Sequence, residues 1–194
     1  MKERLILASG SPRRRELLEN LRIPFSVVVS EIEEIIDPNL SPAETVMSLA
    51  LQKAEAVAES YRDVYVMGAD TVVVLDGQIL GKPKDEADAI DMLKKLSGRA
   101  HDVFTGVALV HGTENHLFYE RTKVTFWDLS EQEIYQYAGT KEPLDKAGAY
   151  GIQGFGSLLV KEIHGDYFSV VGLPVAKTVR ELRTFGLLDK REEA

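Results

Sequence analysis

The chain has 194 residues, of which 44% are hydrophobic and 28% are charged, and its formal net charge at pH 7 is −8. This size allows a buried core in one large domain or two small lobes, and the acidic balance argues against a general nucleic-acid or membrane-surface binder, which needs a broad basic face. The sequence contains no cysteine, which excludes disulfides, thiolate zinc sites and cysteine nucleophiles.

The first part of the chain predicts two strands and two helices. Arg4–Ala8 has the composition of a short buried strand, and Ser11 followed by proline is typical of a helix start. Ile23–Val29 indicates a second strand. Ser41–Glu44 has the pattern of a capping box, which begins a long helix ending near Tyr61.

The later elements mix strands and helices without strict alternation. Val64–Leu75 is an apolar strand, and the following Asp76-Gly77 indicates a hairpin turn. The remaining predictions are helices at 85–96, 130–138 and 174–185, strands at 101–111, 117–127 and 157–163, and a glycine-rich segment at 148–156. We therefore expect an α/β fold with a mixed sheet, which can divide the chain into two lobes with a cleft.

The chain shows no export or membrane signal. Its first apolar run, Leu5–Ala8, is too short for a signal-peptide core. No stretch approaches the roughly 18 apolar residues of a membrane span. We therefore predict a cytoplasmic protein.

The stretch from Ser9 to Arg14 has the composition of an anion site. A strand that ends in a small-residue turn before a helix directs backbone N–H groups and the positive end of the helix dipole to one place. The hydroxyls of Ser9 and Ser11 add donors, and Arg13 and Arg14 add positive charge. The helix dipole disfavours arginines at this end of the helix, and a bound phosphate would offset that repulsion. The pattern therefore favours a phosphate site, and a solvated basic patch is the alternative.

Two charged residues occur in apolar surroundings. On a helical wheel, Lys53 lies within the apolar stripe of the predicted helix, where a lysine either reaches the solvent edge or meets an anion. Asp70 interrupts the apolar strand at 64–75, where a carboxylate needs an ion partner, hydrogen bonds or a metal. The alternative for Asp70 is a turn aspartate that accepts backbone N–H bonds.

Three further features carry weaker signals. Lys82 follows the hairpin, and Glu33 and Glu34 lie in an acidic run that could hold a divalent ion or form a solvated loop. Gln153 lies in a glycine-rich piece that matches neither a Walker loop nor a dinucleotide fingerprint. Its amide both donates and accepts and could read a base edge, or the piece could be a flexible loop. A polyphosphate ester with a hard divalent cation would satisfy all these groups together.

Taken together, these segments resemble the Maf family of nucleotide pyrophosphatases. The matching pieces run in family order over nearly the whole chain: LASGSPRRREL (7–17), QKA (52–54), GADTVV (68–73), LGKPKD (80–85), LSGRAHDVFTGV (96–107), KEPLDKAGAYGIQG (141–154) and GDYFSVVGLP (165–174). The resemblance implies one Maf-like domain over residues 1–194. Its fold would be related to the inosine triphosphate pyrophosphatases, with an elongated mixed sheet and a cleft between two lobes.

The resemblance also implies an activity. Hydrolysis of a nucleoside triphosphate to the monophosphate and pyrophosphate is expected, assisted by Mg²⁺ or Mn²⁺, and residues 149–154 are similar to the branch that prefers dTTP and UTP. By position, Asp70 resembles the catalytic acceptor, Arg13, Thr71 and Gln153 the specificity residues, and Ser9, Arg14, Glu34, Lys53 and Lys82 further active-site residues. We expect Asp70 and Glu34 to hold the metal.

The same residues are compatible with two other functions. A non-catalytic nucleotide-binding regulator of septum formation would need the basic groups but neither Asp70 nor a metal. A purine-directed pyrophosphatase would share the chemistry and differ in base preference. The resemblance also suggests a homodimer, and the expected partner is a nucleoside triphosphate rather than a nucleic acid or a membrane.

Overall fold

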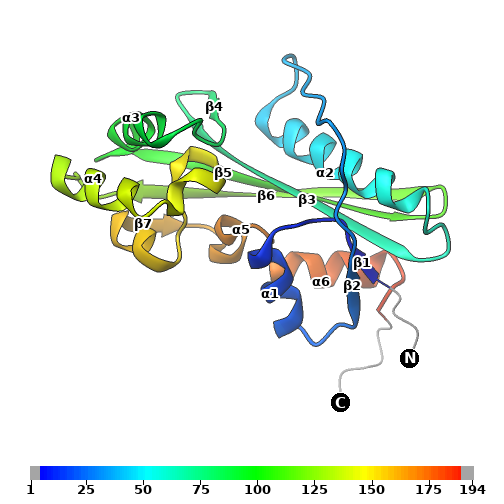
Figure 1. Ribbon diagram of the computed structural model, residues 1–194. Coiled ribbons are helices and arrows are strands. Elements are labelled where there is room, and N and C mark those ends of the chain that lie inside the picture. Colours follow the sequence, from blue (N-terminus) through cyan, green and yellow to red (C-terminus); the bar gives the residue numbers. More distant parts are fainter. Residues whose placement is uncertain (1–4, 189–194) are drawn as a thin grey trace. The chain divides into compact units, whose positions relative to one another are not determined.

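The computed structural model describes residues 5–188, which contain a mixed seven-stranded sheet flanked by helices (Figure 1). The strand order is β2-β1-β3-β5-β6-β7, and β4 pairs with β3. The strands are β1 (Leu5–Leu7), β2 (Phe25–Val27), β3 (Tyr65–Leu75), β4 (Gln78–Leu80), β5 (Ala100–His111), β6 (Glu114–Phe126) and β7 (Val160–His164). β1 runs parallel to β2 and β3, whereas β4 is antiparallel to β3 and β7 is antiparallel to β6. The predicted mixed α/β fold is confirmed.

The helices begin where local capping signals predict. Ser11, Ser41 and Ser130 are N-caps, and the last two form complete capping boxes with the glutamate three residues on. The α-helices are α1 (Pro12–Asn20), α2 (Pro42–Ala58), α3 (Glu86–Leu96), α4 (Glu131–Gly139), α5 (Tyr167–Val171) and α6 (Val175–Thr184), and 3-10 helices occupy 142–145, 147–149 and 154–159. Among residues 5–188, no helix is long and apolar enough to span a bilayer.

Two predicted strands are shorter in the structure than expected, and one helix was not predicted. The strand predicted at Ile23–Val29 is limited to Phe25–Val27, because its partner β1 has only three residues. The strand predicted from residue 157 begins at Val160, after a 3-10 helix, and the short helix α5 was not predicted. The first predicted strand residue, Arg4, lies outside the described range.

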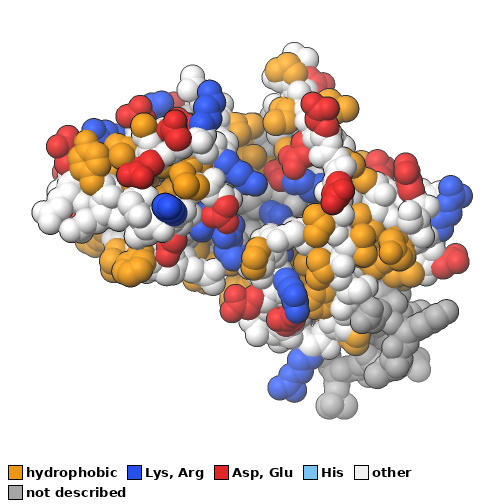
Figure 2. Space-filling model, viewed as in Figure 1, with side chains coloured by type: hydrophobic (Ala, Val, Ile, Leu, Met, Phe, Trp, Pro, Cys, Tyr) orange, Lys and Arg blue, Asp and Glu red, His pale blue; other side chains and the backbone are white. Residues whose placement is uncertain are grey.

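The segment between β2 and α2 contains no helix or strand. It carries both the acidic run and two highly exposed isoleucines, Ile35 and Ile36. Figure 2 shows hydrophobic and acidic side chains together on its surface. Since so much apolar surface stays exposed, packing alone does not hold this segment in place.

The described residues form two compact units. The first comprises the chain up to Asp70, residues 105–120 and the chain from Gly172, and the second comprises residues 71–104 and 121–171. In the first unit, α2 lies on one side of the strands, and α1 and α6 lie on the other (Figure 1). Each unit has its own apolar core, the first built where α2 covers β1 and β3.

Two glycines let α2 approach the strands of the first unit closely. A Cβ at Gly68 of β3 would lie 2.1 Å from the carbonyl oxygen of Ala50, and one at Gly106 of β5 would lie 2.4 Å from the carbonyl carbon of Val46. Helix backbone therefore rests directly on strand backbone. Asp70 is two residues beyond Gly68, so its side chain leaves β3 on the face that meets α2.

The close approach predicts the effect of adding a methyl group at Gly68. Gly68→Ala should lower the free energy of unfolding by about 1–3 kcal/mol or more, because the Ala50 carbonyl must move to admit the Cβ. Gly139→Ala is the control, since a Cβ at this exposed last residue of α4 meets nothing within 4 Å. Urea unfolding followed by circular dichroism measures both, and equal stability of the two variants would contradict the account.

Candidate active site

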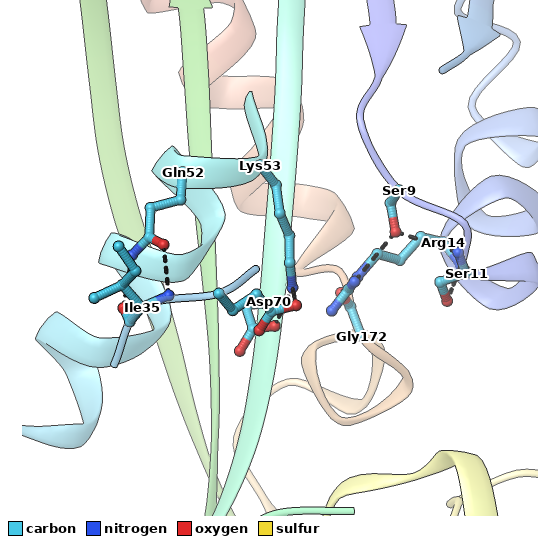
Figure 3. A network of polar contacts seen from close by, with 9 residues as sticks. Ser9, Ser11, Arg14, Ile35, Gln52, Lys53, Asp70 and Gly172 are labelled. Carbon is cyan, nitrogen blue, oxygen red and sulfur yellow. Dashed lines mark hydrogen bonds and ion pairs between the residues drawn. The ribbon is translucent and has the colours of Figure 1, made fainter. Parts of the chain in front are cut away.

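The turn between β1 and α1 is tied together by its two serines and Arg14 (Figure 3). The Ser9 hydroxyl accepts from the Ser11 N–H at 3.2 Å and from Arg14 Nη1 at 3.3 Å. The Ser11 hydroxyl caps α1 by accepting from the Arg14 N–H at 3.4 Å. In these contacts both hydroxyls act as acceptors, so each keeps its own O–H to donate to an anion.

Arg14 is held by a segment distant in sequence. Its Nε donates to the carbonyl oxygen of Gly172 at 2.8 Å, at the start of the stretch that leads into α6. The guanidinium is thereby fixed at the first turn of α1 instead of extending into solvent. The solvated basic patch considered from the sequence therefore does not describe Arg14.

Lys53 and Asp70 form an ion pair on the face where α2 meets β3 (Figure 3). Lys53 Nζ lies 2.6 Å from Asp70 Oδ1, and both side chains are only 14% exposed. The same ammonium lies 3.1 Å from Glu34 Oε1, whose side chain is 43% exposed. Lys53 thus joins two carboxylates that are far apart in the sequence, and Glu34 rather than Glu33 is the acid that the structure brings to it.

Arg14 shares an electrostatic environment with these carboxylates. Burial lowers the pKa of its guanidinium, whereas Asp70 raises that pKa, Arg13 lowers it and Glu34 raises it. Since a guanidinium is not deprotonated in proteins, Arg14 is cationic at neutral pH. The first unit therefore concentrates three cationic and two anionic side chains, a set that leaves positive charge for an anionic ligand.

The carboxylates present fit a magnesium ion that shares its coordination with a ligand. Among residues 5–188, no group of three or more histidines, aspartates and glutamates forms a preformed metal cage. Mg²⁺ is usually bound by one or two carboxylates together with substrate phosphates and water. Glu34 and Asp70, which meet at Lys53, provide such a pair.

The other predicted site residues belong to the second unit. Thr71 follows Asp70 in β3, Lys82 lies exposed after β4, and Gln153 lies exposed before the 3-10 helix at 154–159. Their participation in one site with Asp70 stays a prediction.

The segment that leads to Gln153 is anchored by two tyrosine hydroxyls. Tyr137 Oη accepts from the Gly151 N–H at 3.1 Å, and Tyr150 Oη lies 2.8 Å from His101 Nε2. Burial lowers the pKa of His101 to about 4 and raises that of Tyr150, so both are neutral at pH 7. The approach to Gln153 is therefore anchored at Tyr150 and Gly151.

Two contacts at the site were not found by sequence reasoning. Gln52 binds the backbone of Ile35 beside Glu34, and the Gly172 carbonyl binds Arg14. The QKA and VVGLP segments contain these residues, but a glutamine on a helix and a glycine in a loop carry no signal of their partners. A separate groove of about 500 Å³, between the end of α1 and β2, contains none of the predicted site residues.

Comparison with known proteins gives consistent matches along the chain. The family model described as Maf-like protein matches residues 4–185. The dTTP/UTP pyrophosphatase of Bacillus cytotoxicus is 61% identical over 94% of this chain and 96% of its own length, and that of Bacillus mycoides is 60% identical over 94% and 95%. Among solved structures, the Ham1 protein of Staphylococcus aureus has a TM-score of 0.48 and 18% identity, covering 78% of this chain and 77% of that one. With a family match of this length and relatives this similar, the chain belongs to the Maf-like protein family.

Proposed function

We propose that this protein hydrolyses dTTP and UTP to the nucleoside monophosphate and pyrophosphate. The relatives that cover nearly the whole chain carry the name dTTP/UTP pyrophosphatase. The observation that carries the proposal is the nearly buried Asp70, paired with Lys53 and close enough to Arg14 to affect its pKa. A reactive carboxylate surrounded by cations is what hydrolysis of a phosphoanhydride requires.

The cations bind and neutralise the triphosphate. Arg14 has the planar guanidinium geometry that suits phosphate oxygens, and its contacts with the Gly172 carbonyl and the Ser9 hydroxyl fix its orientation. Ser9 and Ser11 direct their O–H groups to the same anion. Lys82 stabilises the charge that develops on the departing pyrophosphate.

Asp70 acts on the water that attacks the α-phosphorus. Its Oδ1 accepts the bond from Lys53, so Oδ2 is the oxygen that takes the proton of the water. Lys53 fixes the orientation of the Asp70 carboxylate and places its own positive charge next to the phosphate. A divalent ion held by Asp70 and Glu34, Mg²⁺ or Mn²⁺, would polarise the phosphate oxygens and the water when bound.

Base recognition is assigned to the specificity positions of the family. Gln153 and Arg13 would face the carbonyl and N3–H edge that uracil and thymine share, and Thr71 is the third specificity position. An amide matches this edge because it donates and accepts at once. Cytosine presents the opposite pattern, so the same residues would leave unpaired polar groups on it. The predicted homodimer and cytoplasmic location stay predictions.

Asp70→Asn is expected to abolish most turnover. An amide is isosteric and still accepts from Lys53, so the fold should persist, but it takes no proton from water. General-base catalysis contributes about 10²–10⁴-fold, and we expect kcat for UTP to fall within that range. Pyrophosphate release measures the loss, and circular dichroism confirms the fold. Retention of more than about a tenth of the wild-type kcat would remove Asp70 from the mechanism.

Substitutions of Glu34 and of its neighbour Glu33 can be compared directly, because each removes one negative charge. Glu34→Gln removes the charge that contacts Lys53, whereas Glu33→Gln removes an equal charge from an exposed neighbouring position. We expect kcat/KM to fall about 10-fold or more for Glu34→Gln and to stay within about twofold for Glu33→Gln. Equal losses in the two variants would mean that the total negative charge of the acidic segment affects activity, and not the specific contact of Glu34 with Lys53.

A nucleotide panel separates the proposed enzyme from its alternatives. UTP and dTTP should be hydrolysed at least about 10-fold more efficiently than CTP, with pyrophosphate release dependent on added Mg²⁺ or Mn²⁺. Higher kcat/KM on ATP or GTP would instead support a purine-directed pyrophosphatase. Binding of UTP with no release of pyrophosphate from any nucleotide would support the non-catalytic regulator of septum formation.

A further inference from the structure

Gln52 binds both backbone polar groups of Ile35 (Figure 3). Its Oε1 accepts from the Ile35 N–H at 2.9 Å, and its Nε2 donates to the Ile35 carbonyl oxygen at 2.9 Å. The same Nε2 lies 3.2 Å from the Ser48 hydroxyl, one turn earlier on α2. The partners fix the orientation of the amide, because only its oxygen can accept from an N–H and only its nitrogen can donate to a carbonyl.

This contact joins α2 to the segment that carries the site acid. Gln52 and Lys53 are neighbours on the helix, and Ile35 and Glu34 are neighbours on the segment. Gln52 holds the backbone of Ile35, and Lys53 meets the carboxylate of Glu34 at 3.1 Å. Two adjacent helix residues therefore bind two adjacent segment residues.

The segment has little else to set its position at this point. It lies between β2 and α2 without helix or strand, and the Ile35 side chain is 74% exposed. The Glu34 side chain is itself 43% exposed, so a single ion pair in solvent would hold it loosely. The two hydrogen bonds of Gln52 hold the backbone of Ile35 itself, whereas the ion pair holds only the end of the Glu34 side chain.

We propose that Gln52 is a positioning residue, which holds Glu34 against Lys53 and so keeps two carboxylates together at the reacting end of the nucleotide. The inference rests on the proposed function and deepens it. Gln52 need not touch the substrate and acts only through the backbone of the segment. The amide suits this task because it both accepts from the Ile35 N–H and donates to the Ile35 carbonyl, whereas a carboxylate could only accept.

Gln52→Ala tests the inference, with Gln136→Ala as its control. Alanine is the best helix former, so neither substitution weakens its helix, and Gln136 is an exposed glutamine on α4. Loss of a residue that orients a site carboxylate costs about 10-fold or more, and we expect this loss in kcat/KM for UTP from Gln52→Ala. Gln136→Ala should match the wild type, and both variants should unfold at the wild-type urea concentration within error.

A double-mutant cycle with Glu34→Gln separates positioning from a merely structural role. If Gln52 acts through Glu34, Gln52→Ala should change kcat/KM by less than about twofold once Glu34 is already Gln. Losses that multiply would overturn the inference, as would a Gln52→Ala enzyme with wild-type kcat/KM.

Amide hydrogen exchange provides a readout that needs neither nucleotide nor metal. In the wild type the Ile35 amide should be protected, and in Gln52→Ala it should exchange faster while the amides of α2 are unchanged. An unprotected Ile35 amide in the wild type would overturn the contact itself. If the contact is present but the wild type releases no pyrophosphate from any nucleotide, the proposed function fails and the positioning role fails with it.

Discussion

The site depends on the ion pair between Lys53 and Asp70, two charges held 2.6 Å apart and largely removed from water. Such a pair contributes little to stability, because the cost of desolvating both charges offsets most of their attraction. Removing Asp70 would leave Lys53 with the half-exposed Glu34 as its carboxylate partner. A pair that adds little stability and yet is nearly buried supports the catalytic role proposed for its members.

The pair exists because α2 lies unusually close to the strands beneath it. Gly68 and Gly106 let helix backbone rest on strand backbone, and this brings a side chain in the apolar stripe of α2 within reach of a side chain on β3. Lys53 would otherwise have to run to the edge of the helix to find water. Packing and electrostatics are thus one constraint here, since the distance between helix and sheet decides whether the ion pair forms.

The parts of this arrangement that could be predicted from sequence are the local ones. A capping box needs only four residues, so the start of α2 at Ser41 was correctly predicted, and the apolar stripe correctly marked Lys53 as unusual. The pairing of Lys53 with Asp70 could not be derived, because it depends on a helix-to-strand distance that no single stretch encodes. The contact of Gln52 with Ile35 could not be predicted either, since its partner is the backbone of a segment whose sequence shows no helical or strand periodicity. The helix α5, with five residues, is too short for a helical repeat to show.

The charge distribution resolves an apparent conflict between the whole chain and its proposed ligand. A protein with net charge −8 repels a nucleoside triphosphate at long range, but salt screens exposed charges beyond about 8 Å at physiological ionic strength. Inside that distance the ligand meets the fixed guanidinium of Arg14 and the ammonium of Lys53, whose fields are screened less because both are partly removed from water. The acidic surface therefore sets a modest barrier to approach, and in the proposed function the cations next to Asp70 provide the binding. Since Glu34 draws Lys53 toward itself as well, the exposed acidic segment also belongs to this balance, and its position affects how much positive charge the phosphate meets.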